Sequence, residues 1–347
     1  MMIFYKIIEK RQKGAYTAMK EYDNLIENPE ECRVKETAEL LLSKTPFYLE
    51  TGWELVTENR NPACSHVQIE QMIQKRTINL IDMELLRILA SFHYLNHYHI
   101  AYLLKERLHP NYHKTSYLGN LNKLKRAGIV LCHIPVAAGA AAGDVPPAPA
   151  SPLRLYCLSQ GAYTYMEPVT PDVHAMQPAG SLRKVEIAAA NQFILHFLHY
   201  CKERVSLLEY LKNVRLGTSS FAIDGIIQYR TAFRKGEPPD LVSLFVLSIR
   251  KQEGWEKRAA MRLHLFKVWL ARHGAQYRIP FPVLVVENLM MAVSLFAVLQ
   301  AQENPLSVYF CPENLLMLYP PLSSIYRCEA DEEGKVKAVR LAIGEDV

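Results

Sequence analysis

The chain has 347 residues, of which 50% are apolar, and this length is enough for two or three domains with hydrophobic cores. The formal net charge is only +5, which permits nucleic acid as a partner without requiring it. Seven cysteines without a C-x-x-C pair argue against a disulfide scaffold and a zinc finger, and favour a cytoplasmic protein. The most apolar stretch, residues 281–299, is interrupted by Glu287 and Asn288, so we expect no membrane span.

Residues 1–79 are predicted to form a small N-terminal α/β attachment. Residues 2–10 have a strand-like pattern, residues 33–43 have a helical pattern, and residues 46–56 resemble a bent strand. Residues 67–76 are expected to form a helix that leads into the next module.

Residues 80–166 have the pattern of a winged helix-turn-helix domain. Three segments carry apolar residues at helical spacing, namely residues 81–90, 97–108 and 114–127. Two strand-like segments rich in β-branched and aromatic residues follow, at residues 129–136 and 153–158. The Ala, Gly and Pro residues of 137–152 predict the long tip of a β-wing between them. Three helices and a ribbon of this order place the third helix in the major groove of DNA.

The third predicted helix carries residue types that contact DNA. The candidate DNA-binding residues are Lys114, Ser116, Tyr117, Asn120, Lys123 and Arg126 on this helix and Arg154 on the second wing strand. Lys and Arg neutralise phosphates, and Asn can pair with adenine through two hydrogen bonds. Residues 80–135 contain seven Lys and Arg against three Asp and Glu. The alternative is that this helix presents an ordinary solvated face in a fold used for protein contacts.

Residues 167–181 are rich in Pro and Gly and predict a linker, and residues 182–347 are predicted to form a second domain. Helices are expected at 182–211 (as one helix or two), 254–273 and 289–300, strands at 241–249, 283–286 and 306–311, a strand or short helix at 220–229, and a closing hairpin at 324–328 and 335–343. Alternating helices and strands predict an α/β domain with a mixed sheet, so the fold class of the whole chain is α+β or α/β.

This order of elements resembles the replication-relaxation family of plasmids and integrative elements. The residues that carry the resemblance are the run 153–161 that closes the wing and Pro239-Asp240 directly before an apolar strand, within about residues 80–311. Members of the family look like a winged helix joined to a domain of the PD-(D/E)XK nuclease fold. The resemblance implies a DNA-binding protein of a bacterial mobile element, acting in replication, transfer or their regulation.

A nuclease of that fold needs an Asp, then an acidic residue and a Lys on the next strand, because carboxylates hold the metal and the Lys supports the reacting water. Asp240 matches the first residue and Lys251 follows the next strand, but no acidic residue stands beside them. Glu186 and Asp224 are further candidate carboxylates. The resemblance therefore implies the scaffold without the chemistry, with no cofactor and no metal. A nuclease that uses Asp240 with Mg²⁺ or Mn²⁺ stays open as the alternative.

Residues 250–278 form a second basic segment, with eight Lys and Arg against two Asp and Glu. Its predicted exposed cations are Lys257, Arg258, Arg262 and Arg272. They are expected either to bind phosphates, more weakly as salt rises, or to form a solvated surface. The expected partner is double-stranded DNA, with the second domain adding phosphate contacts or forming a homodimer. A protein-binding adaptor is the third hypothesis.

Overall fold

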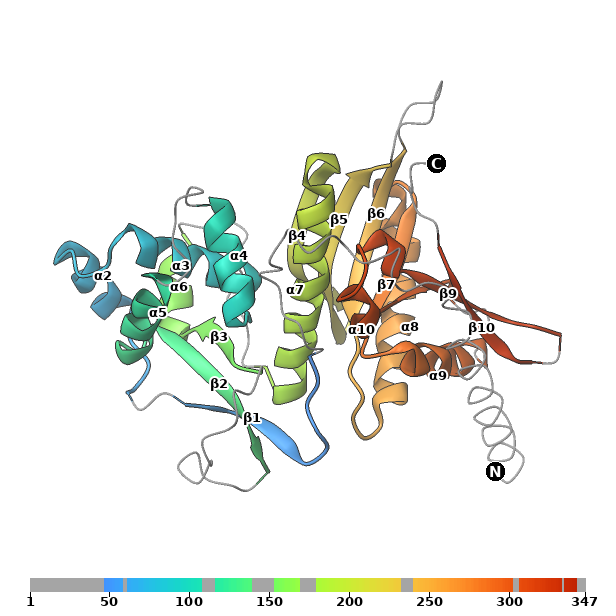
Figure 1. The fold of residues 1–347 in the computed structure, drawn as a ribbon, viewed down its shortest axis with the longest axis horizontal. Helices are drawn as coiled ribbons and strands as arrows, with labels where there is room; N and C mark the ends of the chain where they lie inside the picture. Colours follow the sequence, from blue (N-terminus) through green and yellow to red (C-terminus); the bar gives the residue numbers. More distant parts are fainter. Residues whose placement is uncertain are drawn as a thin grey trace. The chain divides into compact units, whose positions relative to one another are not determined.

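The computed structural model describes residues 47–58, 61–107, 116–138, 153–168, 179–231, 240–301, 306–332 and 334–341. The chain divides into two compact units, which we call the N-terminal unit (residues 40–192) and the C-terminal unit (from residue 193) (Figure 1). The division falls within helix α7 (Ser181–Cys201), and not in the linker predicted at 167–181. Residues 1–46, which include the first predicted strand and helix, lie outside the described residues.

The N-terminal unit combines helices with a three-stranded antiparallel sheet of order β1-β2-β3. Its elements are β1 (Trp53–Thr57), α2 (His66–Gln74), α3 (Leu80–Phe92), α4 (His97–Arg107), α5 (Ser116–Arg126), β2 (Val130–Ala137), β3 (Leu155–Leu158) and α6 (Gln160–Met166). The predicted helices and strands of 80–166 are therefore present. Because β1 pairs with β2, the described part of residues 1–79 belongs to this unit and is not a separate attachment.

Two glycines allow the segment that joins β1 to α2 to pack closely against the rest of the unit. A Cβ atom on Gly128 would lie 2.1 Å from the Pro62 carbonyl oxygen, and one on Gly161 would lie 2.2 Å from the Cys64 carbonyl oxygen. Gly128 also has a φ of 69° and accepts a hydrogen bond from the Cys64 amide at 2.8 Å. Both positions require glycine because the two backbones approach too closely for a side chain.

The C-terminal unit is built on a seven-stranded mixed sheet of order β10-β9-β8-β7-β6-β5-β4. Its elements after α7 are β4 (Val205–Leu216), β5 (Ser219–Arg230), β6 (Leu241–Ser248), α8 (Trp255–His273), β7 (Pro280–Val286), α9 (Leu289–Gln300), β8 (Tyr309–Pro312), α10 (Glu313–Leu316), β9 (Tyr326–Ala330) and β10 (Val336–Arg340), with short 3-10 turns at 202–204, 274–276 and 322–324. β4, β5 and β6 form an antiparallel meander, and β7 and β8 continue parallel to β6. The predicted mixed sheet is confirmed.

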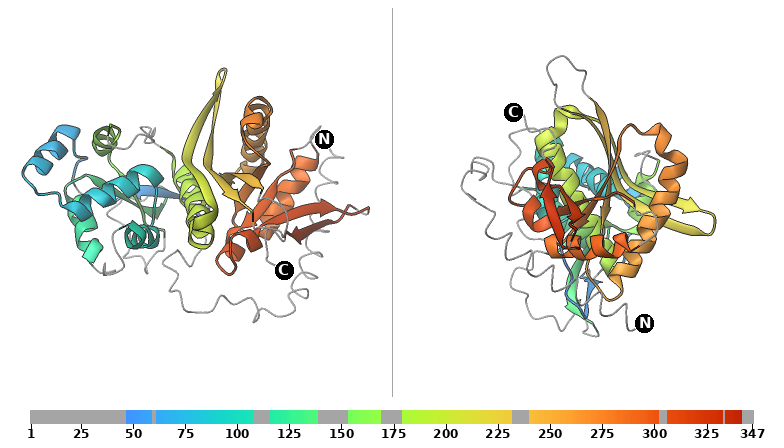
Figure 2. Two further views of the ribbon diagram at one scale, coloured as in Figure 1. Left: turned by 90° about the horizontal axis from the view of Figure 1, so that it is seen from above. Right: turned by 90° about the vertical axis from the view of Figure 1, so that its right-hand side faces the viewer.

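Helices cover both faces of this sheet (Figure 2). α8 and α9 bury Phe266 and Leu295 in one cluster with Phe245 of β6. The last turns of α7 pack on the other face, where Phe197 lies 5.1 Å from the ring centroid of Tyr229. These two apolar layers hold β5, which carries Asp224, and β6, which directly follows Asp240.

The helix predicted at 182–211 ends early, at Cys201, and residues 205–211 belong to strand β4. The apolar residues Leu207 and Leu208 do not extend a buried helical stripe; both pair with β5, and Leu207 remains 38% exposed. The turn at Gly217, with a φ of 62°, closes the hairpin. For residues 220–229 the strand alternative is correct.

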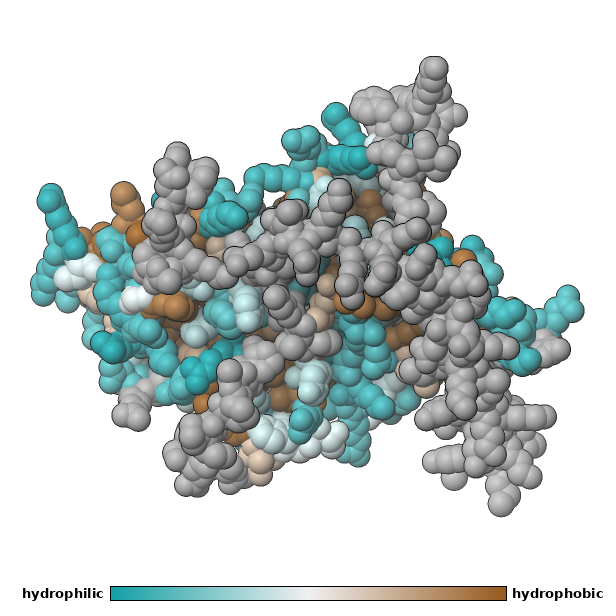
Figure 3. Space-filling view, viewed as in Figure 1, coloured by the Kyte–Doolittle hydropathy of each residue, from teal (hydrophilic) through white to brown (hydrophobic). Residues whose placement is uncertain are grey.

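The surface is mixed in character. Figure 3 shows hydrophilic and apolar residues interspersed on one face, with the apolar areas small and separate. No helix in the described ranges is long and apolar enough to cross a membrane.

Candidate functional site

One side of helix α5 is turned toward α3 and α4. Tyr117 is 3% exposed, and its hydroxyl donates to the His97 carbonyl oxygen at 3.1 Å. The Asn120 amide donates to Asp82 Oδ1 at 2.8 Å. The Lys123 ammonium donates to the Thr77 carbonyl oxygen at 2.9 Å and also contacts Asp82 Oδ2. These three candidate DNA-binding side chains are thus used inside the unit.

The reason is the buried carboxylate of Asp82. It is 0% exposed and accepts the Asn79 amide at 2.8 Å, while Asn79 accepts the Asp82 amide at 2.9 Å, so the two residues form the capping box that begins α3. A buried carboxylate needs charged or hydrogen-bonding partners, and Lys123 and Asn120 supply them. The prediction that Tyr117, Asn120 and Lys123 form a solvent-facing polar side is therefore wrong, although the Lys123 side chain keeps 41% exposure.

A different side of α5 faces solvent. Leu118, which is 43% exposed, lies there with the exposed residues Gly119, Asn122 and Arg126. A Cβ atom on Gly119 would meet no atom within 4 Å, so the backbone of the helix is open at this point. Lys114 and the side chain of Ser116 lie outside the described residues.

Two further cations near the ribbon share one acid. Lys125 lies 2.7 Å and Arg154 3.6 Å from the carboxylate of Glu58. Burial opposes ionisation of Glu58, but these two cations outweigh it and lower the pKa of its carboxyl group. Lys125 and Arg154 are thus partly neutralised, whereas the side chain of Arg126 is exposed.

In the C-terminal unit the candidate nuclease residues do not meet. Asp240 directly precedes β6 and is exposed, and its amide donates to Thr231 Oγ1 at 3.0 Å. Lys251 follows the other end of β6, which has 8 residues. A strand of that length spans roughly 25 Å. Because the ligands of one metal ion lie within about 2.6 Å of it, Asp240 cannot share a metal with groups near Lys251.

Asp224 on β5 is the carboxylate that lies at that second end of β6. Its Oδ2 accepts the amide of Ser248 at 2.6 Å, and the residue is 3% exposed. The recorded strand pairs on either side are Tyr210 with Gly225 and Lys212 with Ile223, and Leu211 between them has a φ of 34°. A non-glycine residue with positive φ in a strand is uncommon, and it marks a local distortion of β4 opposite Asp224.

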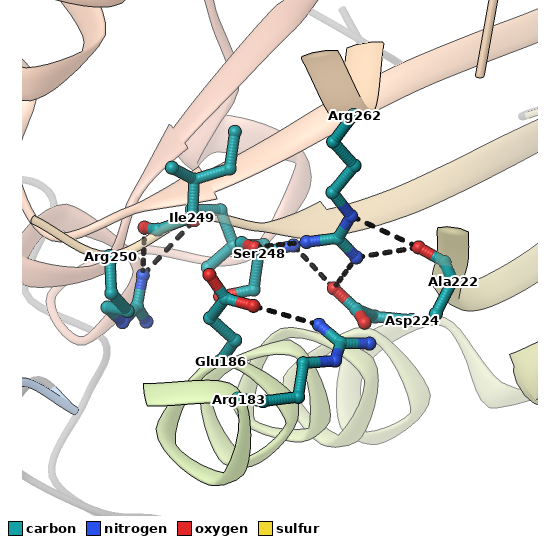
Figure 4. A network of polar contacts seen from close by, with 9 residues as sticks. Arg183, Glu186, Ala222, Asp224, Ser248, Ile249, Arg250 and Arg262 are labelled. Atoms are coloured by element: carbon teal, nitrogen blue, oxygen red, sulfur yellow. Dashed lines mark hydrogen bonds and ion pairs between the residues drawn. The ribbon is translucent and has the colours of Figure 1, made fainter. Parts of the chain in front are cut away.

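Arg262 of α8 is directed at the same point (Figure 4). Its guanidinium donates to Asp224 Oδ2 at 2.8 Å, to the Ser248 carbonyl oxygen at 2.7 Å, and to the Ala222 carbonyl oxygen at 2.7 and 3.1 Å. The side chain is 15% exposed. The prediction that Arg262 belongs to an exposed basic surface is therefore wrong, because its planar fork matches a cluster of oxygen acceptors on β5 and at the end of β6.

The segment after β6 completes the site with a second arginine. Arg250 is 1% exposed, pairs with the fully buried carboxylate of Glu313, and donates to the Val285 carbonyl oxygen at 3.1 Å. Ser248 contacts Asp224 through its backbone amide, and Arg250 follows it by two residues. Ser248, Arg250 and Glu313 were not candidates from the sequence. The lone Asp224 among the apolar residues of β5 is the signal that points to them.

The structure also describes the other candidate residues. Glu186 belongs to the N-terminal unit, and Arg183 pairs with it at 3.0 Å. Lys257, Arg258 and Arg272 of α8 are exposed as predicted. The described residues contain no group of three His, Cys, Asp or Glu side chains arranged to hold a metal.

The residues at Asp224 do not fit the metal of the nuclease alternative. Asp224 is a carboxylate, but the neighbouring position holds Ser248 and the space between the oxygens is taken by a guanidinium. Comparison of the chain with protein-family models, with curated proteins and with solved structures finds no match.

Proposed function

We propose that this protein is a non-enzymatic DNA-binding protein of a bacterial mobile element, similar to the replication-relaxation family, and that it binds double-stranded DNA through a winged helix-turn-helix module. The order α3, α4, α5 and the β2–β3 ribbon supports this interpretation, because it matches the order of elements in such modules. The observation that carries the proposal is the solvent-facing side of α5, which differs from the side expected from the sequence.

This surface has the composition of a DNA-reading helix. Asn122 offers both a donor and an acceptor to a base edge, and Arg126 offers a cation to phosphate or guanine. Gly119 between Leu118 and Asn122 leaves the helix backbone bare in open space. A glycine in the interior of an exposed helix costs about 0.5–1 kcal/mol relative to Ala, and close approach of a ligand to the backbone is one reason to keep it.

Binding of a short duplex, measured by fluorescence anisotropy over a salt series, tests this proposal. Arg126→Ala is expected to weaken binding and to reduce the slope of log K against log salt by about one unit, because one phosphate contact is lost. Lys105→Ala is the matched control, since Lys105 is an exposed cation of α4 on the same unit. Equal effects of the two substitutions would count against a specific role for α5.

A substitution at Gly119 distinguishes a role of α5 in DNA binding from a role in folding alone. Gly119→Gln is expected to stabilise α5, because glutamine is a better helix former, and to weaken DNA binding at least about tenfold, because its side chain blocks close approach. A variant that is more stable and binds DNA normally would contradict the proposed interface.

The protein-binding alternative has one observation in its favour. Leu80 at the start of α3 is 86% exposed, and Leu118 on α5 is 43% exposed, so apolar side chains are available to a protein partner. If Leu118→Ser abolishes binding of a protein partner while Asn122→Ala and Arg126→Ala leave DNA affinity unchanged, the adaptor hypothesis replaces the DNA-binding one.

The nuclease alternative receives no support from Asp240, which lies far from Lys251 along β6. Plasmid cleavage with Mg²⁺ or Mn²⁺ that is lost in Asp240→Ala would nevertheless restore it. We expect no cleavage under either ion, and we expect the exposed cations Lys257, Arg258 and Arg272 to contribute at most to phosphate binding.

A further inference from the structure

The guanidinium of Arg262 is surrounded by oxygen atoms that converge from two strands. Asp224 Oδ2 and the Ala222 carbonyl oxygen come from β5, and the Ser248 carbonyl oxygen comes from the end of β6. Carboxylate and carbonyl oxygens are the ligands that hard divalent cations use in proteins. Here a side chain of the same chain, anchored on α8, provides the positive charge.

A second observation concerns Ser248 itself. Its hydroxyl oxygen is buried and has no hydrogen-bond partner within the described part of the chain. Buried hydroxyl groups are normally hydrogen-bonded, so an unpartnered hydroxyl beside Asp224 and Arg262 leaves one oxygen acceptor that the protein itself does not use. A metal ion or a metal-bound water would use this oxygen, whereas the guanidinium, which can donate to acceptors, does not reach it.

We infer that Arg262 is a built-in replacement for a divalent cation, and that it closes a latent metal site formed by Ala222, Asp224 and Ser248. The chain keeps the oxygen ligands but supplies its own cation, so the site needs no metal to balance the buried carboxylate. This inference concerns the C-terminal unit and does not depend on whether α5 binds DNA.

Removing the guanidinium should open the site. In Arg262→Ala the Asp224 carboxylate has lost a cation that neutralised it, which is unfavourable for a buried charge, and a divalent ion can restore the balance. Because an ion that binds the folded state stabilises it, the variant should gain thermal stability with added metal. A rise of roughly 5 °C in the melting temperature is expected with millimolar Mn²⁺, and a smaller one with Mg²⁺.

Three comparisons make the experiment specific. The wild-type protein and Arg272→Ala, which removes an exposed arginine from the same helix, are expected to shift by less than about 1 °C under the same ions. Asp224→Asn combined with Arg262→Ala should abolish the metal response. Ser248→Asp combined with Arg262→Ala adds a second carboxylate and should strengthen Mn²⁺ binding at least about tenfold, measured by the loss of the free Mn²⁺ signal in electron paramagnetic resonance.

If Arg262→Ala does not fold without metal, Arg262→Met, which retains the apolar stem of the side chain, carries the same test. The inference is overturned if neither variant responds to Mn²⁺ more than Arg272→Ala does. It is also overturned if the wild-type protein binds Mn²⁺ with the response expected of the variants, or if the response survives Asp224→Asn.

Discussion

In each unit a basic side chain pairs with a buried aspartate, but the two basic side chains differ in exposure. In the N-terminal unit Lys123 of α5 reaches Asp82, and in the C-terminal unit Arg262 of α8 reaches Asp224. The Lys123 side chain is 41% exposed, whereas that of Arg262 is 15% exposed. A guanidinium donates to several acceptors in one plane, but an ammonium is a point charge that water can partly replace. An Arg that pairs with a buried Asp can therefore hold more backbone carbonyl groups in place than a Lys can.

The largest expected effect comes from removing the aspartate of the arginine cluster. Asp224→Ala should lower the free energy of unfolding by about 3–5 kcal/mol, because it leaves Arg262 without its carboxylate and the Ser248 amide without its acceptor. Two of the three tryptophans, Trp255 and Trp269, lie in this unit, so denaturant unfolding followed by tryptophan fluorescence reports mainly on it. Asp240→Ala is the control and should change the free energy by less than about 0.5 kcal/mol.

Acid should destabilise the N-terminal unit, because it buries His99 and His133. Burial lowers the pKa of His99 to about 4 and that of His133 to about 3, with Lys184 contributing at His133. Between pH 6.5 and 4 the unfolded chain protonates His99 and the folded chain does not, so the stability present above pH 6.5 is lost as the pH falls. The loss should approach about 3 kcal/mol for His99 at pH 4.

Unfolding curves at several pH values check this dependence. His99→Asn should flatten the dependence of unfolding free energy on pH by up to about 1.4 kcal/mol per pH unit between pH 6 and 4.5, relative to the wild-type protein. Unchanged slopes would mean that His99 is not held neutral by the fold.

Asp82→Asn should have a smaller effect than Asp224→Ala. The amide retains an acceptor for the Asn79 backbone but no longer balances the Lys123 charge, and we expect a loss of about 2 kcal/mol. A loss as large as that of Asp224→Ala would show that exposure of the cation does not set the difference between the two pairs.

Lys123→Met is expected to have the smallest effect, about 1 kcal/mol, because Asn120 and the Asn79 amide still satisfy Asp82 and water reaches the half-exposed position. Thermal unfolding checks the value. DNA affinity should also be little changed, because the proposed interface lies on another side of α5.

The longer helices, such as α3, α8 and α9, could be predicted because their apolar residues repeat at helical spacing, and β6 and β7 because they are short apolar runs. Strand β4 could not, since Leu207 and Leu208 continue the apolar sequence of α7 and the pairing with β5 is a long-range contact. The orientation of polar side chains could not be predicted in the same way. Their polarity predicts that Asn120, Lys123 and Arg262 face solvent, but in the folded chain they contact the buried carboxylates of Asp82 and Asp224.

The close approach of Gly128 and Gly161 to residues 62–64 limits how the protein can be dissected. A fragment that starts at residue 80 would retain α3, α4 and α5. It would expose the backbone at Gly128 and Gly161, and β2 would lose the strand that pairs with its edge. A fragment of the N-terminal unit should therefore include β1 and the segment around Pro62 and Cys64, because both pack against the elements that follow.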